Sequence, residues 1–143
     1  MGAVKVQARD SLDLAAPPER VFDVLLNMAA YGSWWPRPVV YQSLPGGRAR
    51  VSNGPLVWWT VAVTRSERPK SIELRYDGGA WKGAAVWTLE PVAAGTRVTY
   101  TVDLNVNWWW LRLLGRVAPF ARLHSWQLIP ALRALGRYAS GAR

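Results

Sequence analysis

Apolar and polar residues alternate along much of the chain, and this period of two is typical of strands with one buried face. The clearest case is residues 96–107, whose apolar positions are Val98, Tyr100, Val102, Leu104 and Val106. Similar alternation predicts further strands at residues 4–15, 39–44, 49–53, 56–66, 71–76 and 82–90. Because glycine-containing turns separate several of these segments, the pattern predicts about seven strands joined mostly as an antiparallel meander.

Apolar residues spaced three or four apart predict two short helices after the first strand. The first spans residues 16–28, begins near Pro18, and buries one stripe formed by Val21, Val24, Leu25 and Met28. Proline suits a first helical position because the amide hydrogen it lacks has no partner there. A second short helix or turn follows at residues 29–35, and Pro36 and Pro38 end it.

The last third of the chain, residues 108–138, is predicted to form a long helix. Pro119 fits its first turn, whereas the interior Pro130 is expected to kink it. The apolar face consists of Val117, Phe120, Ala121, His124, Leu128, Ala131, Leu132, Leu135 and Tyr138. The opposite side carries Arg116, Arg122, Gln127, Arg133 and Arg137.

The chain of 143 residues is expected to form a single α+β domain, residues 1–143. Its order of elements, and the stretches LDLAAPPERVFDVLLNMAAYGSWWP, ERPKSIEL and WTLEPVAAGTRVTYTV, resemble the START-like (SRPBCC) superfamily. That superfamily includes bacterial polyketide cyclases and Bet v 1-type ligand carriers. The resemblance covers essentially the whole chain. It implies a helix-grip fold, in which a curled seven-stranded antiparallel sheet wraps around the C-terminal helix, with an apolar cavity between them.

Composition excludes several classes of site. The chain has no cysteine and one histidine, so disulfides, thiolate metal sites and sites with several imidazoles are ruled out. The carboxylates show no metal-ligand spacing, so no metal is expected. No phosphate-binding loop, nicotinamide or flavin fingerprint or nucleophile elbow is present, so no cofactor is expected either. The N-terminus lacks an apolar core typical of a signal peptide, and no apolar run is long enough to span a bilayer, which favours a cytoplasmic protein.

The inward positions of the predicted fold carry large rings beside small residues such as Ala49 and Ala85, which suits a pocket for a flat or branched apolar ligand. The alternative is that the rings fill the core, and for any single ring this alternative is favoured. For the aromatic rings taken together, a ligand cavity is favoured over core packing, because the resemblance implies a cavity. The candidate substrate-binding residues are Tyr31, Trp35, Trp59, Tyr76, Trp81, Trp87, Tyr100, Phe120 and Leu128.

His124 and Asp10 are the candidate catalytic residues. His124 lies on the apolar face of the terminal helix, where an imidazole titrating near neutral pH suits enolisation or dehydration of a polyketone. The alternative is a core histidine bonded to a backbone group or water. Asp10 is on the inward phase of the first strand, as a cavity carboxylate or at a bulge. An Asp10–His124 pair would orient the imidazole and raise its pKa.

Three consecutive tryptophans, Trp108, Trp109 and Trp110, cannot all point inward. We expect them to gate the mouth of the cavity, with weak membrane-surface contact as the second interpretation and nucleic-acid binding as the third. The formal charge of +9, from 18 Lys and Arg against nine Asp and Glu, also suits an acidic acyl carrier protein as a partner. Scattered arginines that only keep an apolar protein soluble are the favoured explanation, because the like charges form no long run.

Two functional hypotheses follow from the sequence and the resemblance. The first is a cofactor-free enzyme of the polyketide cyclase or dehydrase type, which shapes a hydrophobic, polyketide-like substrate inside the cavity. The second is a carrier that binds or transfers a lipid or another hydrophobic ligand without chemistry. Loss of turnover with retained binding, when His124 or Asp10 is replaced, separates the first hypothesis from the second.

Overall fold

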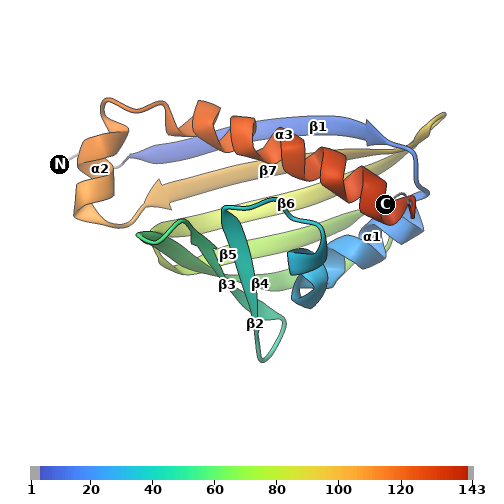
Figure 1. The fold of residues 1–143 in the computed structure, drawn as a ribbon, viewed down its shortest axis with the longest axis horizontal. Coiled ribbons are helices and arrows are strands. Elements are labelled where there is room, and N and C mark those ends of the chain that lie inside the picture. The colour runs from blue at the N-terminus through green and yellow to red at the C-terminus, as the bar shows by residue number, and fades with distance from the viewer. Residues whose placement is uncertain (1–3, 142–143) are drawn as a thin grey trace.

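The computed structural model describes residues 4–141, and its elements follow the predicted order (Figure 1). They are β1 (Lys5–Leu14), α1 (Pro18–Leu26), the 3-10 helix η1 (Met28–Ser33), β2 (Val39–Leu44), β3 (Arg48–Asn53), β4 (Val57–Glu67), β5 (Ser71–Gly79), β6 (Trp81–Val92), β7 (Gly95–Val106), α2 (Trp109–Gly115) and α3 (Phe120–Ala139). The predicted α+β helix-grip architecture, with seven strands and two short helices after the first strand, is confirmed.

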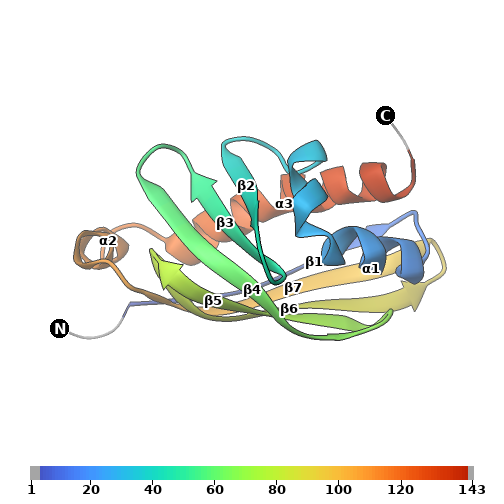
Figure 2. The same cartoon turned by 90° about the horizontal axis from the view of Figure 1, so that it is seen from below.

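The seven strands form one antiparallel sheet in the order β1-β7-β6-β5-β4-β3-β2. Strands β2 to β7 are a continuous meander, and β1 joins the sheet beside β7, at the other end from β2 (Figure 2). The β1–β7 register runs without interruption from Lys5 opposite Asn105 to Leu14 opposite Thr96. No bulge therefore occurs at Asp10, and that alternative is wrong.

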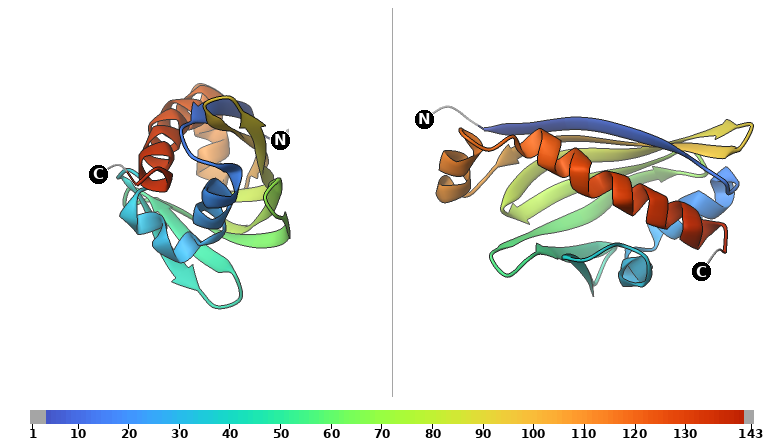
Figure 3. Two further views of the ribbon diagram at one scale, coloured as in Figure 1. Left: turned by 90° about the vertical axis from the view of Figure 1, so that its right-hand side faces the viewer. Right: turned by 45° about the horizontal axis from the view of Figure 1, so that its top comes forward.

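Irregularities in the middle of the sheet accompany its curl. The β4–β5 register shifts between Thr60 and Val61 and again between Val63 and Arg65, and such bulges bend a strand and increase its twist. At the end of β5, Gly79 has φ of 80°, and a Cβ there would lie 2.4 Å from the Trp58 carbonyl oxygen. The sheet therefore curves, and α3 lies along its open side (Figure 3).

Gly95 and Thr96 fix the start of β7 against the end of β1. Gly95 has φ of 146°, and a Cβ at this position would lie 2.3 Å from the Leu14 carbonyl oxygen, so only glycine allows this approach. The buried Thr96 hydroxyl donates a hydrogen bond of 2.7 Å to the Ala16 carbonyl oxygen. The connection between β1 and α1 is thereby held to a strand that follows 80 residues later in the chain.

The core lies between the concave face of the sheet, α1 and the second half of α3. Helix α3 packs mainly on β1 and also on α1. Its buried side chains are Leu128, Ala131, Leu132, Ala134, Leu135 and Ala139. Those of α1 are Val21, Phe22, Val24 and Leu25.

The last third of the chain is two helices, where the sequence predicted one. Helix α2 ends at Gly115, and α3 begins at Phe120 and continues through Pro130. Pro119 has no amide hydrogen and disfavours a helical conformation at Ala118, so it separates the helices. Val117, predicted to be on the apolar face, lies between them and is 83% exposed. Within residues 4–141, no helix combines the length and apolarity needed to cross a bilayer.

Candidate functional site

A cavity of about 280 Å³ lies between the sheet, α2 and the first half of α3. Its volume is near the lower end of the roughly 300–1,000 Å³ found for small-molecule sites, so a ligand of one or two rings suits it. Most of its walls are aliphatic or aromatic. The lining side chains are Val6, Asn53, Val57, Trp59, Trp81, Leu104, Leu111, Leu114, Phe120, Leu123, His124 and Gln127.

His124 is the one ionisable side chain among these lining residues. Its ring is stacked on that of Tyr100, with the ring centroids 6.0 Å apart and an interplanar angle of 13°. Its Nδ1 atom is buried and has no hydrogen-bond partner among residues 4–141. A buried imidazole nitrogen without a partner is costly, and a ligand with a suitable polar atom would remove that cost.

Burial lowers the pKa of His124 below its ordinary value of 6.5, and the negative charge of Asp10 counteracts part of this effect. The imidazole is therefore neutral at pH 7, with one ring nitrogen as a donor and the other as an acceptor. The charge of Asp10 acts in the predicted direction, since it raises the pKa of His124, but desolvation of the charged ring is the larger effect and the net shift is downward.

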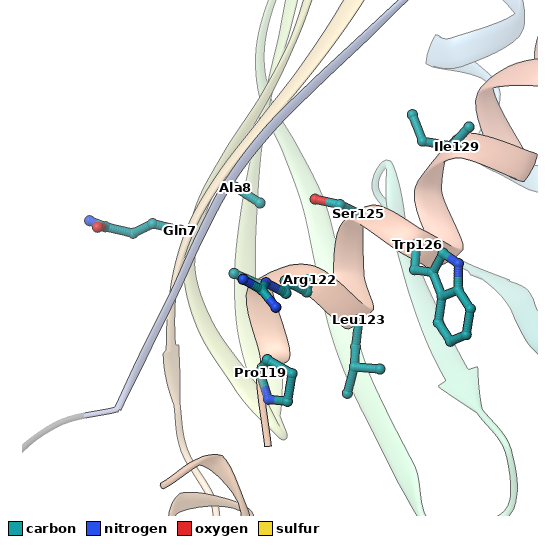
Figure 4. A pocket seen from close by; sticks show the side chains of 9 residues that line it. Gln7, Ala8, Pro119, Arg122, Leu123, Ser125, Trp126 and Ile129 are labelled. Carbon is teal, nitrogen blue, oxygen red and sulfur yellow. The ribbon is translucent and has the colours of Figure 1, made fainter. Parts of the chain in front are cut away.

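Asp10 interacts with Ser125 and has no hydrogen bond with His124. The Ser125 hydroxyl donates a hydrogen bond of 2.9 Å to Oδ2 of Asp10, and this bond joins α3 to β1. Figure 4 shows Ser125 pointing from α3 toward β1. Consecutive helical residues differ in direction by about 100°, so Ser125 faces the strand while His124 faces the cavity. The predicted Asp10–His124 hydrogen bond is absent, and Asp10 does not line the cavity.

A hydrogen bond between two amides crosses the rim of the cavity. Nδ2 of Asn53, at the end of β3, donates to Oε1 of Gln127 on α3 at 2.9 Å, and the pair is exposed to solvent. Gln127, which the sequence placed on the opposite side of the helix, is a lining residue of the cavity. The bond links α3 to a strand near the edge of the sheet opposite β1.

Three of the predicted substrate-binding rings line the cavity, namely Trp59, Trp81 and Phe120. Trp81 is in edge contact with both of the others, with centroid distances of 6.3 Å to Trp59 and 5.8 Å to Phe120. The three rings come from β4, β6 and α3, so the site depends on the correct pairing of distant segments.

The other predicted substrate-binding residues lie outside the lining of the cavity. Tyr76 and Tyr100 share a buried hydrogen bond of 2.8 Å between their hydroxyls, and burial raises the pKa of Tyr76 to about 12. Trp87 packs on Tyr100 with a centroid distance of 4.1 Å, and Leu128 is buried on α3. Tyr31 and Trp35 belong to a separate aromatic cluster around η1, with Trp34 and Tyr41.

Eight lining residues were absent from the predicted set: Val6, Asn53, Val57, Leu104, Leu111, Leu114, Leu123 and Gln127. A signal for Val6 and Leu104 exists, because both occupy inward positions of strands with clear alternation. Leu111 and Leu114 had no such signal, since the sequence did not separate α2 from α3.

The three consecutive tryptophans do not line the cavity. They border an open surface hollow of about 810 Å³, together with Leu56. Trp108 is half-buried against Trp58, with a centroid distance of 5.7 Å, whereas Trp109 is 66% exposed. The expectation that they cover the mouth is therefore wrong, and α2 contributes Leu111 and Leu114 to the cavity instead.

A second open groove, of about 640 Å³, separates β1 from the first half of α3 (Figure 4). Leu123 and Trp126 project from α3 away from β1 in this view. Leu123 borders both this groove and the cavity. Among residues 4–141, no three histidine, aspartate or glutamate side chains come together in a way that could hold a metal ion.

Comparison with protein families gives one match, over residues 5–135, to the family described as polyketide cyclase/dehydrase and lipid transport. The chain belongs to this family. The match includes β1 to β7, α2 and α3 as far as Leu135, and therefore all the lining residues of the cavity. A separate comparison with individually curated proteins gives no match.

Several solved structures are similar to this member of the polyketide cyclase/dehydrase and lipid transport family. TTHA0849 from Thermus thermophilus is 20% identical, with a TM-score of 0.72, over 96% of this chain and 97% of that one. The di-domain ARO/CYC protein StfQ from the steffimycin biosynthetic pathway is 13% identical, with a TM-score of 0.72, over 96% of this chain and 52% of that one. Norcoclaurine synthase from Thalictrum flavum is 10% identical, with a TM-score of 0.67, over 99% and 98%. At these identities the likeness concerns the fold.

Proposed function

We propose that this protein binds a small apolar molecule that carries a carbonyl or hydroxyl group, and acts on it as a cofactor-free enzyme of the polyketide cyclase or dehydrase type. The observation that carries the proposal is that His124, whose buried Nδ1 has no partner among residues 4–141, is the one ionisable residue that lines the cavity. The family description, which names both cyclase/dehydrase and lipid transport, supports a hydrophobic ligand.

His124 is the catalytic residue in this proposal. In an aldol cyclisation, the neutral imidazole takes a proton from the methylene between two ketones. The resulting enolate carbon then forms a bond to the carbon of another carbonyl group, farther along the substrate chain. The imidazolium then returns the proton to the new alkoxide oxygen, so that the ring ends neutral. A second proton transfer from carbon, with loss of the hydroxyl as water, completes a dehydration. The apolar walls favour the neutral ring at the start of each cycle.

Asp10 is a positioning residue in this proposal, because it acts on His124 through its charge and through the helix. Its bond to Ser125 holds the turn of α3 that carries His124 against β1. Its charge favours the imidazolium that forms during the reaction, as the direction of its effect on the pKa of His124 indicates. Trp59, Trp81 and Phe120 hold the apolar part of the substrate, and an acidic acyl carrier protein is a partner that suits the charge of +9.

A carrier of hydrophobic ligands is the second candidate function. The observation that favours it is that Asp10 accepts its hydrogen bond from Ser125, so His124 has no hydrogen-bonded carboxylate to support proton transfer; burial also lowers the pKa of the imidazole. In a carrier, His124 donates or accepts one hydrogen bond that orients the ligand and no covalent bond changes.

Two measurements on the same variants separate these functions. Calorimetric titration with 2-naphthol and with decanoate measures binding, and a poly-β-keto thioester analogue, followed by the absorbance of its aromatic product, measures turnover. We expect His124→Leu to lose turnover and retain most of the binding of 2-naphthol. Binding without turnover in the wild type would support the carrier, and turnover that survives His124→Leu would contradict the proposed role of the imidazole.

Blocking the cavity tests the location of the site. Val57→Trp places a ring where β4 lines the cavity, and we expect it to abolish binding of both probes. Val40→Trp is the matched control, because Val40 is 52% exposed on β2 and does not line the cavity. Equal binding by the two variants would place the ligand elsewhere.

A further inference from the structure

Most of the exposed large apolar side chains belong to one segment of the chain. Of the ten large apolar side chains that are exposed within residues 4–141, seven lie between Trp109 and Trp126. These seven form what we term the α2–α3 surface: Trp109, Trp110, Leu113, Leu114, Val117, Leu123 and Trp126. We propose that the α2–α3 surface docks on an anionic lipid bilayer, with the mouth of the cavity facing the lipid.

The exposed apolar residues of α2 lie on one side of the helix. Residues four apart lie on the same side of a helix, so Trp109 is in line with Leu113, and Trp110 is in line with Leu114. Leu111 points the other way and is buried. Helix α2 and the beginning of α3 lie together at one end of the fold (Figure 1), and Leu56, which is 72% exposed, borders the same hollow as Trp109 and Trp110.

The degree of exposure is high for side chains of this size. Trp109 is 66% exposed, Trp126 is 79% exposed and Val117 is 83% exposed. Large contiguous apolar patches on soluble domains mark sites of interaction with a protein or a membrane. Tryptophan favours the boundary between headgroups and acyl chains, where its apolar ring is buried and its N–H stays hydrated.

The charge around the α2–α3 surface complements an anionic headgroup layer. After Asp103 the chain has no acidic residue, whereas it has Arg112, Arg116, Arg122, Arg133, Arg137 and Arg143. Arg112 donates to two backbone carbonyls next to α2. Arg116 and Arg122 are exposed, and neither belongs to any of the five ion pairs found among residues 4–141. Arginines beside an inserted apolar surface add attraction to anionic lipid.

A second copy of the chain is a less suitable partner for the same surface. A symmetric dimer through this surface would pack two copies of a segment that carries Arg116 and Arg122 and has no carboxylate to compensate their charge. A bilayer of anionic lipid accepts both the apolar rings and the arginines. The charge therefore favours lipid.

The surface and the cavity are continuous. Leu114 and Leu123 belong to the exposed surface and also line the cavity. A molecule dissolved in the outer part of a bilayer can therefore reach His124 without crossing water. The inference adds a partner to the proposed function and needs only that the ligand is apolar, so it holds for an enzyme and for a carrier.

Flotation with vesicles tests the docking surface without any ligand. Vesicles of phosphatidylcholine with 30% phosphatidylglycerol are compared with vesicles of phosphatidylcholine alone, at low and high salt. We expect the protein to float with the anionic vesicles and salt to weaken this binding. We expect Trp109→Ser with Trp126→Ser to abolish it, because both rings are exposed and their loss leaves the core intact.

Charge variants provide a second, matched test. Arg116→Gln with Arg122→Gln should weaken binding about fivefold for each arginine, or about 25-fold together. Lys70→Gln with Arg75→Gln removes the same charge from exposed positions on and next to β5, farther along the sheet from α2, and should change binding little.

Absence of flotation, or equal weakening by both pairs of charge variants, would overturn the proposal. The proposal would also be overturned if the wild type did not bind vesicles and light scattering showed a dimer that the two tryptophan substitutions dissociate. Because 2-naphthol binding is measured separately in solution, a failure here leaves the cavity and the role of His124 untouched.

Discussion

The lowered pKa of His124 predicts how the stability of the protein depends on pH. The folded-state pKa lies below 6.5 because burial disfavours the charged imidazole. Between the folded-state value and the unfolded-state value of about 6.5, the unfolded chain binds more protons than the folded one. The free energy of unfolding therefore falls as the pH drops below about 6.5, and this contribution levels off below the folded-state pKa.

The magnitude follows from the proton linkage of a single group. One proton bound by the unfolded state alone changes the free energy of unfolding by at most about 1.4 kcal/mol per pH unit. The stabilisation from the neutral, buried imidazole is fully present above pH 7.5. Below that pH, the equilibrium constant for folding falls by at most about tenfold per pH unit because of this group. The prediction is free of interference from other imidazoles, because His124 is the only histidine in the chain.

Urea unfolding at pH 7.5, 6.5 and 5.5, followed by tryptophan fluorescence, measures this contribution for the wild type and for His124→Leu. Carboxylates that titrate in this range contribute to both proteins, so the difference between them isolates the imidazole. We expect the stability of the wild type relative to His124→Leu to decrease as the pH falls. A difference that stays constant, or that increases toward acid pH, would refute the reasoning from burial.

Two substitutions separate the charge of Asp10 from its hydrogen bond. Asp10→Asn removes the charge and keeps an acceptor for Ser125, so it should lower the pKa of His124 further, as measured by the chemical shift of the single imidazole. Ser125→Ala removes the donor and keeps the charge, so it should leave that pKa nearly unchanged. The opposite order of effects would contradict the positioning role of Asp10.

Three further predictions concern the frame around the site. Asn53→Ala, which removes the amide bond to Gln127 at the rim, should change stability by less than about 1 kcal/mol but speed the release of 2-naphthol in stopped-flow measurements. Thr96→Val should cost about 1–2 kcal/mol in urea unfolding, because the buried Ala16 carbonyl loses its donor. Leu132→Ala, at a fully buried position of α3, should cost about 2–5 kcal/mol in the same assay, whereas a loss below about 1 kcal/mol would place that face of α3 at the surface.

The sheet could be predicted from the sequence because alternation reports directly which face of a strand is buried. In β7 the apolar residues alternate without a break from Val98 to Val106, although Thr99 on the other face is buried as well. The meander follows from short turns between neighbouring strands. Helix boundaries were less well determined. A proline in the first turn of a long helix and a proline between two helices look the same in the sequence. Pro119 therefore did not reveal the break between α2 and α3.

The cavity was harder to predict than the fold because periodicity gives the face of a strand and not the depth along it. Trp59 and Trp81 lie where the sheet opens toward α2, whereas Trp87 and Tyr100 lie farther along the same concave face, where core packing covers them. His124 was correctly placed on the cavity side of its helix. The hydrogen bond to Asp10 comes from the next residue, Ser125. A helical pattern of apolar residues does not determine which of two consecutive side chains faces β1.

The most direct test of the site is the imidazole resonance of His124, recorded by NMR at pH 7 while 2-naphthol is added. The chain has a single histidine, so the signal needs no assignment by mutation. We expect a saturable shift of this resonance that Val57→Trp abolishes and Val40→Trp does not. Binding of 2-naphthol that leaves the imidazole resonance unchanged would contradict the claim that the cavity holds its ligand against His124.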